Sequence, residues 1–144
     1  MRDKISSWED CKEENFSVKI TPNKGKAKSL IETAEGRIEY ASEKEINNKK
    51  LNYVFEDYYT SLIEMIHALT ILDSYNVSNH ICLGFYLKDI LKKEKLFRLF
   101  DNIRFKRNSL VYYGKRMTSE EASEGIEKCK IIIDEVKNLI KEKG

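Results

Sequence analysis

Apolar residues recur every three or four positions along most of this chain, which is the spacing of amphipathic helices. Segment 51–72 is hydrophobic around much of its circumference, so we predict a central helix that contacts several neighbours. Its main stripe consists of Leu51, Phe55, Tyr58, Leu62, Met65, Ile66, Leu69 and Leu72. His67 lies within this segment, and we interpret it as a core residue.

Local start signals delimit the other helices. Thr21 before Pro22 predicts a helix that begins there and carries an apolar stripe to Ala41, followed by a loop or a fraying helix end over 42–50. Ser78 or Asn79 is expected to cap a shorter helix, and the pattern then predicts a helix over 94–112. The sequence Thr-Ser-Glu-Glu at 118–121 is a capping box, which starts a last helix that continues to about residue 140.

The first twenty residues form an extension with a weaker pattern. A short helix is expected around Trp8 within residues 1–15, and an alternating extended piece covers 16–20. We therefore predict an all-α fold, a helical bundle of about five helices, in a single domain of residues 1–144 with the bundle over 21–144. A chain of this length is sufficient to bury a substantial core.

The composition indicates a folded soluble protein. Hydrophobic residues make up 41% of the 144 positions and charged residues 35%. No apolar run approaches the roughly 20 residues that span a bilayer, and the N-terminus lacks an apolar signal core, so we expect a cytoplasmic protein without membrane contact. Cys11, Cys82 and Cys129 are widely spaced without metal-ligand spacing, so we expect reduced thiols, no metal and no cofactor.

Positive charge is concentrated in one segment. Residues 88–116 contain ten Lys or Arg against three Asp or Glu, a balance of +7 that leaves −5 for the rest of a chain whose total is +2. Such a segment is typical of a surface that contacts nucleic-acid phosphates, although an ordinary solvated helix surface gives the same pattern.

Within this segment, Arg107 occupies a position where the helical stripe of Leu96, Phe100 and Ile103 calls for an apolar side chain. A buried guanidinium requires partners, because an unpaired buried charge costs several kcal/mol. Glu56 and Glu64 on the central helix are candidate partners, or they are exposed carboxylates. Alternatively, the stem of Arg107 packs while its head reaches water.

The residues after Arg107 favour a phosphate site. A guanidinium binds phosphate oxygens bidentately and stabilises charge that develops on them. Asn108 is suited to orienting a phosphate or the arginine head, and Arg104 and Tyr113 are further candidates for the same site. Tyr112 and Tyr113 lie about 140° and 240° around the helix from Arg107, so they share its site most easily at a helix end or across a dimer.

The stretch from Phe55 to Ile140 resembles the HEPN domain family. Its markers are FEDYYTSLIEMIHAL, SYNVSNHICLGFYL, RFKRNSLVYYG and the capped SEEASEGIEKCKIIIDEVKNLI helix. The N-terminal WEDC and KAKSLIETAEGRIEY are similar to archaeal members of the group. The resemblance implies a helical bundle that forms a homodimer, with an Arg-x(4–6)-His motif from each copy at a shared cleft.

Active members of that family are metal-independent ribonucleases, many of them toxins paired with a minimal nucleotidyltransferase. On this resemblance Arg107 matches the family arginine and Asn108 the polar residue that often follows it. Tyr112 stands at the histidine position, and Gly114 stands where certain toxins carry a further tyrosine. Tyrosine is a poor base near neutral pH, and loss of a general base costs on the order of 10²–10⁴ in rate.

His80 is a candidate replacement for the missing histidine, or it caps and packs at its helix start. The hypothesis that the sequence favours is an RNA- or nucleotide-binding protein that uses an arginine-centred cleft at a dimer interface. The context implied by the resemblance is a toxin–antitoxin or stress system, with a nucleotidyltransferase as partner. The alternatives are an endoribonuclease that uses Arg107 and Tyr112, and a helical dimer in which Arg107 forms a structural ion pair.

Overall fold

The computed structural model describes residues 4–44 and 50–143. Its elements in chain order are α1 (Trp8–Glu13), β1 (Ser17–Lys19), α2 (Lys24–Ser42), α3 (Leu51–Leu72), β2 (Tyr75–Val77), α4 (His80–Phe85), the π-helical turn η2 (Tyr86–Ile90), α5 (Glu94–Tyr113) and α6 (Ser119–Glu142). The prediction of a helical protein is confirmed, apart from one small two-stranded sheet: the extended piece predicted at 16–20 contains β1, whereas its partner β2 was not predicted.

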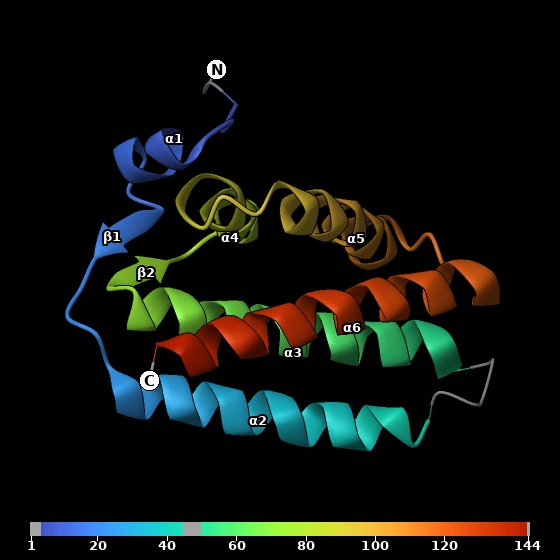
Figure 1. The fold of residues 1–144 in the computed structure, drawn as a ribbon. Helices are drawn as coiled ribbons and strands as arrows, with labels where there is room; N and C mark the ends of the chain where they lie inside the picture. The colour runs from blue at the N-terminus through green and yellow to red at the C-terminus, as the bar shows by residue number, and fades with distance from the viewer. Residues whose placement is uncertain (1–3, 45–49, 144) are drawn as a thin grey trace.

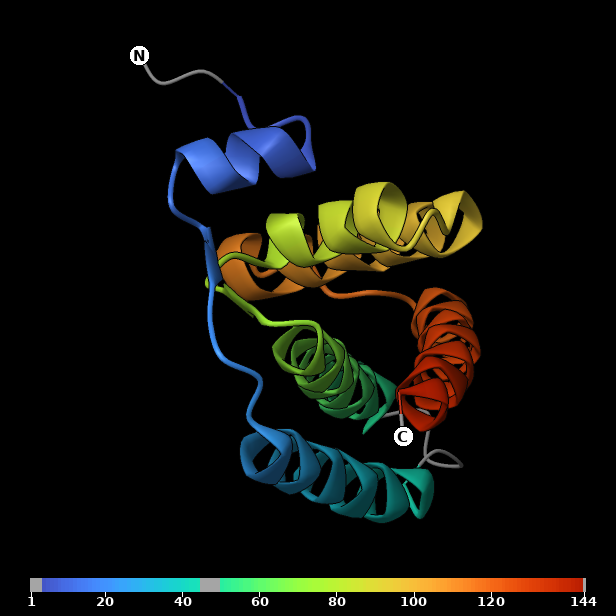
Figure 2. The ribbon, with the colours of Figure 1, turned by 60° about the vertical axis from the view of Figure 1, so that its left-hand side comes forward.

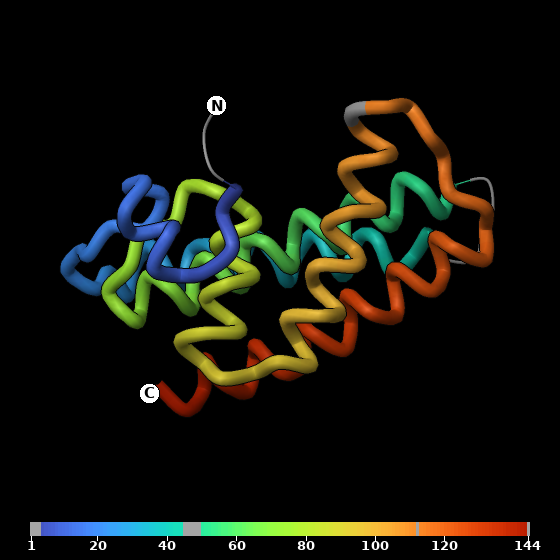
Figure 3. Tube along the Cα trace, turned by 90° about the horizontal axis from the view of Figure 1, so that it is seen from above, coloured from blue at the N-terminus to red at the C-terminus, as the bar shows by residue number. Residues whose placement is uncertain are grey.

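Helix α3 is the central element of the fold, as its apolar circumference predicts. It packs most extensively against α2 on one side and α6 on another, while α4 and α5 form a layer above it (Figures 1 and 2). Seen from above, α5 crosses over α3 and α6 (Figure 3). One hydrophobic core draws side chains from all six α-helices within the described ranges.

The crossing of α6 over α3 is close. A Cβ atom at Gly125 would lie 2.7 Å from the ring of Phe55, a distance that real Cβ atoms do not adopt. Phe55 is fully buried, so the glycine allows the two helices to pack around its ring. The four-three spacing predicted for this last helix is confirmed by the burial of Ala122, Ile126 and Cys129 along one face.

The observed helix starts follow the side chains that satisfy free backbone N–H groups. The predicted start at Thr21 and Pro22 is wrong by two residues, because the side chain of Asn23 accepts the backbone N–H of Lys26 and caps α2. Asn79, not Ser78, caps α4. The capping box of Thr118 is confirmed, since its side chain accepts from the Glu121 backbone while the Glu121 carboxylate accepts from the Thr118 N–H.

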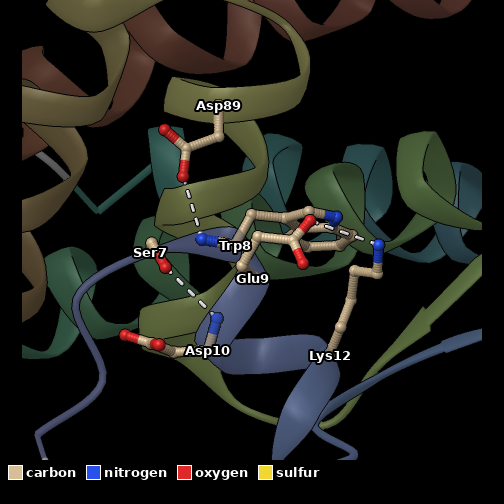
Figure 4. Close-up of polar contacts among 6 residues, drawn as sticks. All are labelled: Ser7, Trp8, Glu9, Asp10, Lys12 and Asp89. Atoms are coloured by element: carbon tan, nitrogen blue, oxygen red, sulfur yellow. Dashed lines mark hydrogen bonds and ion pairs between the residues drawn. The ribbon is translucent and has the colours of Figure 1, made fainter.

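The N-terminal extension folds onto the bundle. Strand β1 pairs antiparallel with β2, so that Val18 lies opposite Asn76. The ring of Trp8 packs edge-on against Tyr75 at a centroid distance of 5.1 Å, and its backbone N–H donates to the carboxylate of Asp89 at 2.9 Å (Figure 4). The helix predicted around Trp8 is therefore confirmed, and η2 supplies the acceptor for its first turn.

A disulfide joins α1 to α4, and it corrects the prediction of three reduced thiols. Cys11 and Cys82 are fully buried, and their Cα atoms lie 6.0 Å apart, within the usual range for a disulfide. The pairing was not visible in the sequence because the two cysteines are 71 residues apart. Cys129 is free and buried, as predicted for a packing thiol.

Two further predictions concern the loop after α2 and the ability of a helix to span a membrane. The loop expected over 42–50 falls for the most part on residues 45–49, which lie outside the described residues. Among the described helices, none is both long enough and apolar enough to cross a membrane.

Candidate functional site

Arg107 on α5 extends toward α3, where it meets a carboxylate and an aromatic ring. Its Nε donates to Oε1 of Glu56 at 3.1 Å, and its guanidinium carbon lies 5.2 Å from the ring centroid of Tyr59. The side chain is 20% exposed and that of Glu56 is 32% exposed. The prediction that Glu56 pairs with Arg107 is therefore confirmed, while the arginine head keeps access to solvent.

Glu64, the other proposed partner, belongs to a different pair. Its carboxylate binds the guanidinium of Arg37 on α2, so it is not part of the arginine site. Glu56 and Glu64 lie eight residues apart on α3, which places them about two turns apart along the helix. The sequence suggested both as partners, but it did not show that α2 supplies an arginine for the second.

His80 joins the same site from the start of α4. Its Nδ1 lies 3.2 Å from the hydroxyl of Tyr59, and the two ring centroids are 5.8 Å apart. The ring of Tyr59 stacks on Phe100 at 6.4 Å, nearly parallel, which fixes its plane. Tyr59 therefore contacts both residues: its hydroxyl lies beside Nδ1 of His80, and the guanidinium of Arg107 lies over its ring.

Arg104 lies one turn before Arg107 and completes the group. One of its terminal nitrogens donates to Asp101 at 2.8 Å, whereas its Nε is buried without an acceptor in the described part of the chain. Oε2 of Glu56 is likewise buried without a donor among the described residues. We call Glu56, Tyr59, His80, Arg104 and Arg107 the arginine cluster.

Asn108 and Tyr113 add no side-chain hydrogen bond to this cluster in the described part of the chain. Asn108 is half-buried, and Tyr113 is exposed at the end of α5. Tyr112 belongs to α5, but its side chain lies outside the described part of the structure, so its proposed catalytic role stays a prediction. Gly114 ends the helix in the left-handed conformation with φ of 64°.

The electrostatics of the cluster favour a neutral imidazole and a protonated phenol. Burial lowers the pKa of His80, and the nearby guanidinium groups of Arg107 and Arg104 lower it further. Burial raises the pKa of Tyr59, against the opposing effect of the same arginines. When Nδ1 of His80 donates to the Tyr59 oxygen, Nε2 is an acceptor for a proton; in the other tautomer Nε2 donates.

The cluster has more donors than its own acceptors can satisfy. Arg107 uses one of its five N–H groups on Glu56, and its four terminal N–H groups have no acceptor within the described ranges. Beside the ion pair lies a pocket of about 360 Å³ that opens toward the end of α5. Its lining consists of Asn52, Tyr53, Glu56, Leu110, Val111, Gly114 and Arg116. Glu56 is the one member of the arginine cluster in this lining, and Arg107 does not line the pocket.

His67 is a separate histidine on α3; it is half-buried, so the prediction of a core residue is only partly confirmed. Burial lowers its pKa to about 4, with smaller contributions from His80 and Lys26. Because the unfolded value is about 6.5, the folded state disfavours the proton, and the resulting stability is fully present above pH 6.5. We therefore expect stability to fall as the pH decreases from about 6.5 to 4, by up to about 3 kcal/mol from this group.

The matching measurement compares urea unfolding of the wild type with that of His67→Gln across this pH range. The variant lacks the titrating group, so its unfolding free energy is expected to fall less than that of the wild type. Parallel pH profiles for the two proteins would show that His67 is not the cause.

Tyr59 is the member of the cluster that sequence reasoning missed. The sequence pattern did not distinguish it from the other apolar positions of the central helix. A buried tyrosine requires a partner for its hydroxyl, and that requirement was the available signal.

Among residues 4–44 and 50–143, no group of three or more His, Cys, Asp or Glu side chains is arranged to hold a metal ion.

No protein-family model matches this chain, and no curated protein or solved structure matches it either. The function is therefore inferred from the geometry of the arginine cluster together with the residue pattern.

Proposed function

We propose that this protein binds RNA, or a nucleotide of the same chemistry, through a phosphate held by the arginine cluster. The observation that carries the proposal is the set of terminal N–H groups on Arg107, which lack an acceptor among the described residues, on a side chain that is partly exposed. Arg104 adds positive charge beside His80, although its buried Nε does not reach a ligand at the surface. Phosphate oxygens complement such a group of donors.

The HEPN resemblance supports the same proposal and extends it. A homodimer would place two clusters at a shared cleft, and a minimal nucleotidyltransferase is the proposed partner in a toxin–antitoxin or stress context. A cytoplasmic location is part of this proposal. The Cys11–Cys82 bond weighs against that location, because reducing compartments keep most cysteine pairs as thiols.

A binding assay with a short fluorescent single-stranded RNA tests the proposal. Arg107→Ala is expected to weaken the affinity about fivefold, because it removes the terminal N–H donors of a guanidinium whose charge Glu56 already offsets in part. Arg98→Ala is the matched control, since Arg98 lies on the exposed face of the same helix, where Glu94 is its i,i+4 partner. Equal affinities for the wild type and Arg107→Ala would contradict the proposal.

Ribonuclease activity is the second candidate, and the position of His80 favours it. An imidazole with a lowered pKa beside two guanidinium groups has the components needed to move a proton at the 2′-hydroxyl and to stabilise charge on the phosphate. RNA incubated with excess protein and a chelator would then yield 2′,3′-cyclic phosphate ends. His80→Ala is expected to abolish those products, and intact RNA with the wild type would reject this candidate.

A further inference from the structure

The outer side of α5 carries a second surface that the arginine cluster does not use. Phe105 lies two residues from Arg107, which places it about 200° around the helix. Its ring is 70% exposed, which is unusual for a phenylalanine in a folded protein. It lines a pocket of about 280 Å³ between the outer side of α5, the loop at 114–118 and the first turn of α6.

This pocket is basic. Lys106, Lys115 and Arg116 line it together with Phe105, and Glu121 is the one carboxylate in its lining. That carboxylate accepts the backbone N–H of Thr118 in the capping box, and this bond chiefly lowers the pKa of Glu121, with the two lysines as lesser causes. The acidic side chain is therefore already engaged, while three cations surround an exposed aromatic ring.

The pocket is connected to the arginine cluster through shared residues. Arg116 lines both this pocket and the one beside the ion pair, and its guanidinium lies 5.9 Å from the ring centroid of Tyr53. Glu56 lines the second pocket and binds Arg107. The two pockets therefore share Arg116 near the end of α5, and Glu56 links the nearer pocket to Arg107, which lines neither of them itself. A ligand that contacts both Arg107 and Phe105 has to extend across both pockets, which favours a strand over a single nucleotide.

We propose that a base of single-stranded RNA stacks on Phe105 while Lys106, Lys115 and Arg116 hold the neighbouring phosphates. Aromatic stacking combined with backbone contacts is the usual mode of single-strand binding, and every base has a face that can stack. The proposal rests on the proposed RNA-binding function and deepens it by naming a strand as the ligand.

A second protein is a poorer occupant of this surface. Stable protein interfaces bury at least about 1,000 Å² in total and have an apolar centre. Phe105 is the one aromatic ring in the lining of its pocket, among charged side chains, and Met117 in the same lining is already buried in the core. Charge complementarity therefore favours a polyanion.

The experiment measures binding of a labelled oligoribonucleotide to Phe105→Ala. We expect the affinity to fall fivefold or more, since stacking on an aromatic ring contributes that much per base, and Phe105→Tyr should retain binding. Tyr40→Ala is the matched control, because Tyr40 is a 60% exposed aromatic residue on α2 with the ammonium of Lys44 over its ring. Circular dichroism verifies that each variant is folded.

The outcomes separate this inference from the proposed function. Weaker binding in Arg107→Ala with unchanged binding in Phe105→Ala would overturn the stacking site alone. The reverse result would support the stacking site and overturn the arginine cluster as the phosphate site. Unchanged RNA binding together with a loss of self-association in Phe105→Ala would show that this surface contacts a second copy, which also overturns the inference.

Discussion

Removal of the Cys11–Cys82 disulfide is expected to lower the unfolding free energy by about 4 kcal/mol. The bond closes a loop of 71 residues, and the chain-entropy model assigns this magnitude to a loop of that length. The effect arises mainly in the unfolded chain, which loses conformational freedom when the loop is closed. Denaturant unfolding of Cys11→Ala/Cys82→Ala measures it, and the wild type with a reducing agent should approach the same midpoint.

Cys129→Ala is the matched control, because this buried thiol is free and closes no loop. The Cys129→Ala variant keeps the disulfide, so its unfolding midpoint should still fall when the reductant is added. A thiol titration of the unreduced, denatured wild type is expected to find one reactive thiol per chain. Three reactive thiols, or a midpoint that does not respond to reductant, would contradict the disulfide.

Glu56→Gln is expected to raise the affinity for single-stranded RNA about tenfold. The Glu56 carboxylate competes with a phosphate for the guanidinium of Arg107, 3.1 Å away. Glutamine keeps the shape and an acceptor oxygen but removes the negative charge, so the arginine is released to the ligand. Close pairs of partly buried charges contribute on the order of 1–2 kcal/mol, which corresponds to this factor.

Glu64→Gln is the control for this change. Glu64 lies on the same helix, and its carboxylate also binds an arginine, but that arginine is Arg37 on α2. The substitution alters the net charge by the same amount, so it measures the general effect of charge on RNA affinity. Equal gains from both substitutions would contradict a specific role for Glu56.

The sequence predicted the positions of the helices better than the contacts between elements. The apolar stripes and the caps at Asn79 and Thr118 are local signals, and the structure confirms the helices that they delimit. The strand at 75–77 was missed because a three-residue strand forms only when β1 pairs with it. The disulfide was also missed because it depends on a contact between distant elements. Cys11 meets Cys82 only because α1 packs on the bundle.

The candidate site was predicted in part. A charge on the packing face of α5 indicated a partner, and Glu56 was one of two residues proposed for it. The stacking of Arg107 on Tyr59, and the contact of Tyr59 with His80, join three helices that are far apart in the sequence. Periodicity assigns each residue to a face of its own helix, but the rotation and crossing of helices decide which faces meet.

The central claim is that Arg107 binds the phosphate of an RNA strand in competition with Glu56. The most direct test measures RNA affinity for the wild type, Glu56→Gln, Arg107→Ala and the double variant. We predict that the gain from Glu56→Gln disappears when Arg107 is absent, because the released guanidinium is what binds the ligand. The same gain in the Arg107→Ala background would contradict this account.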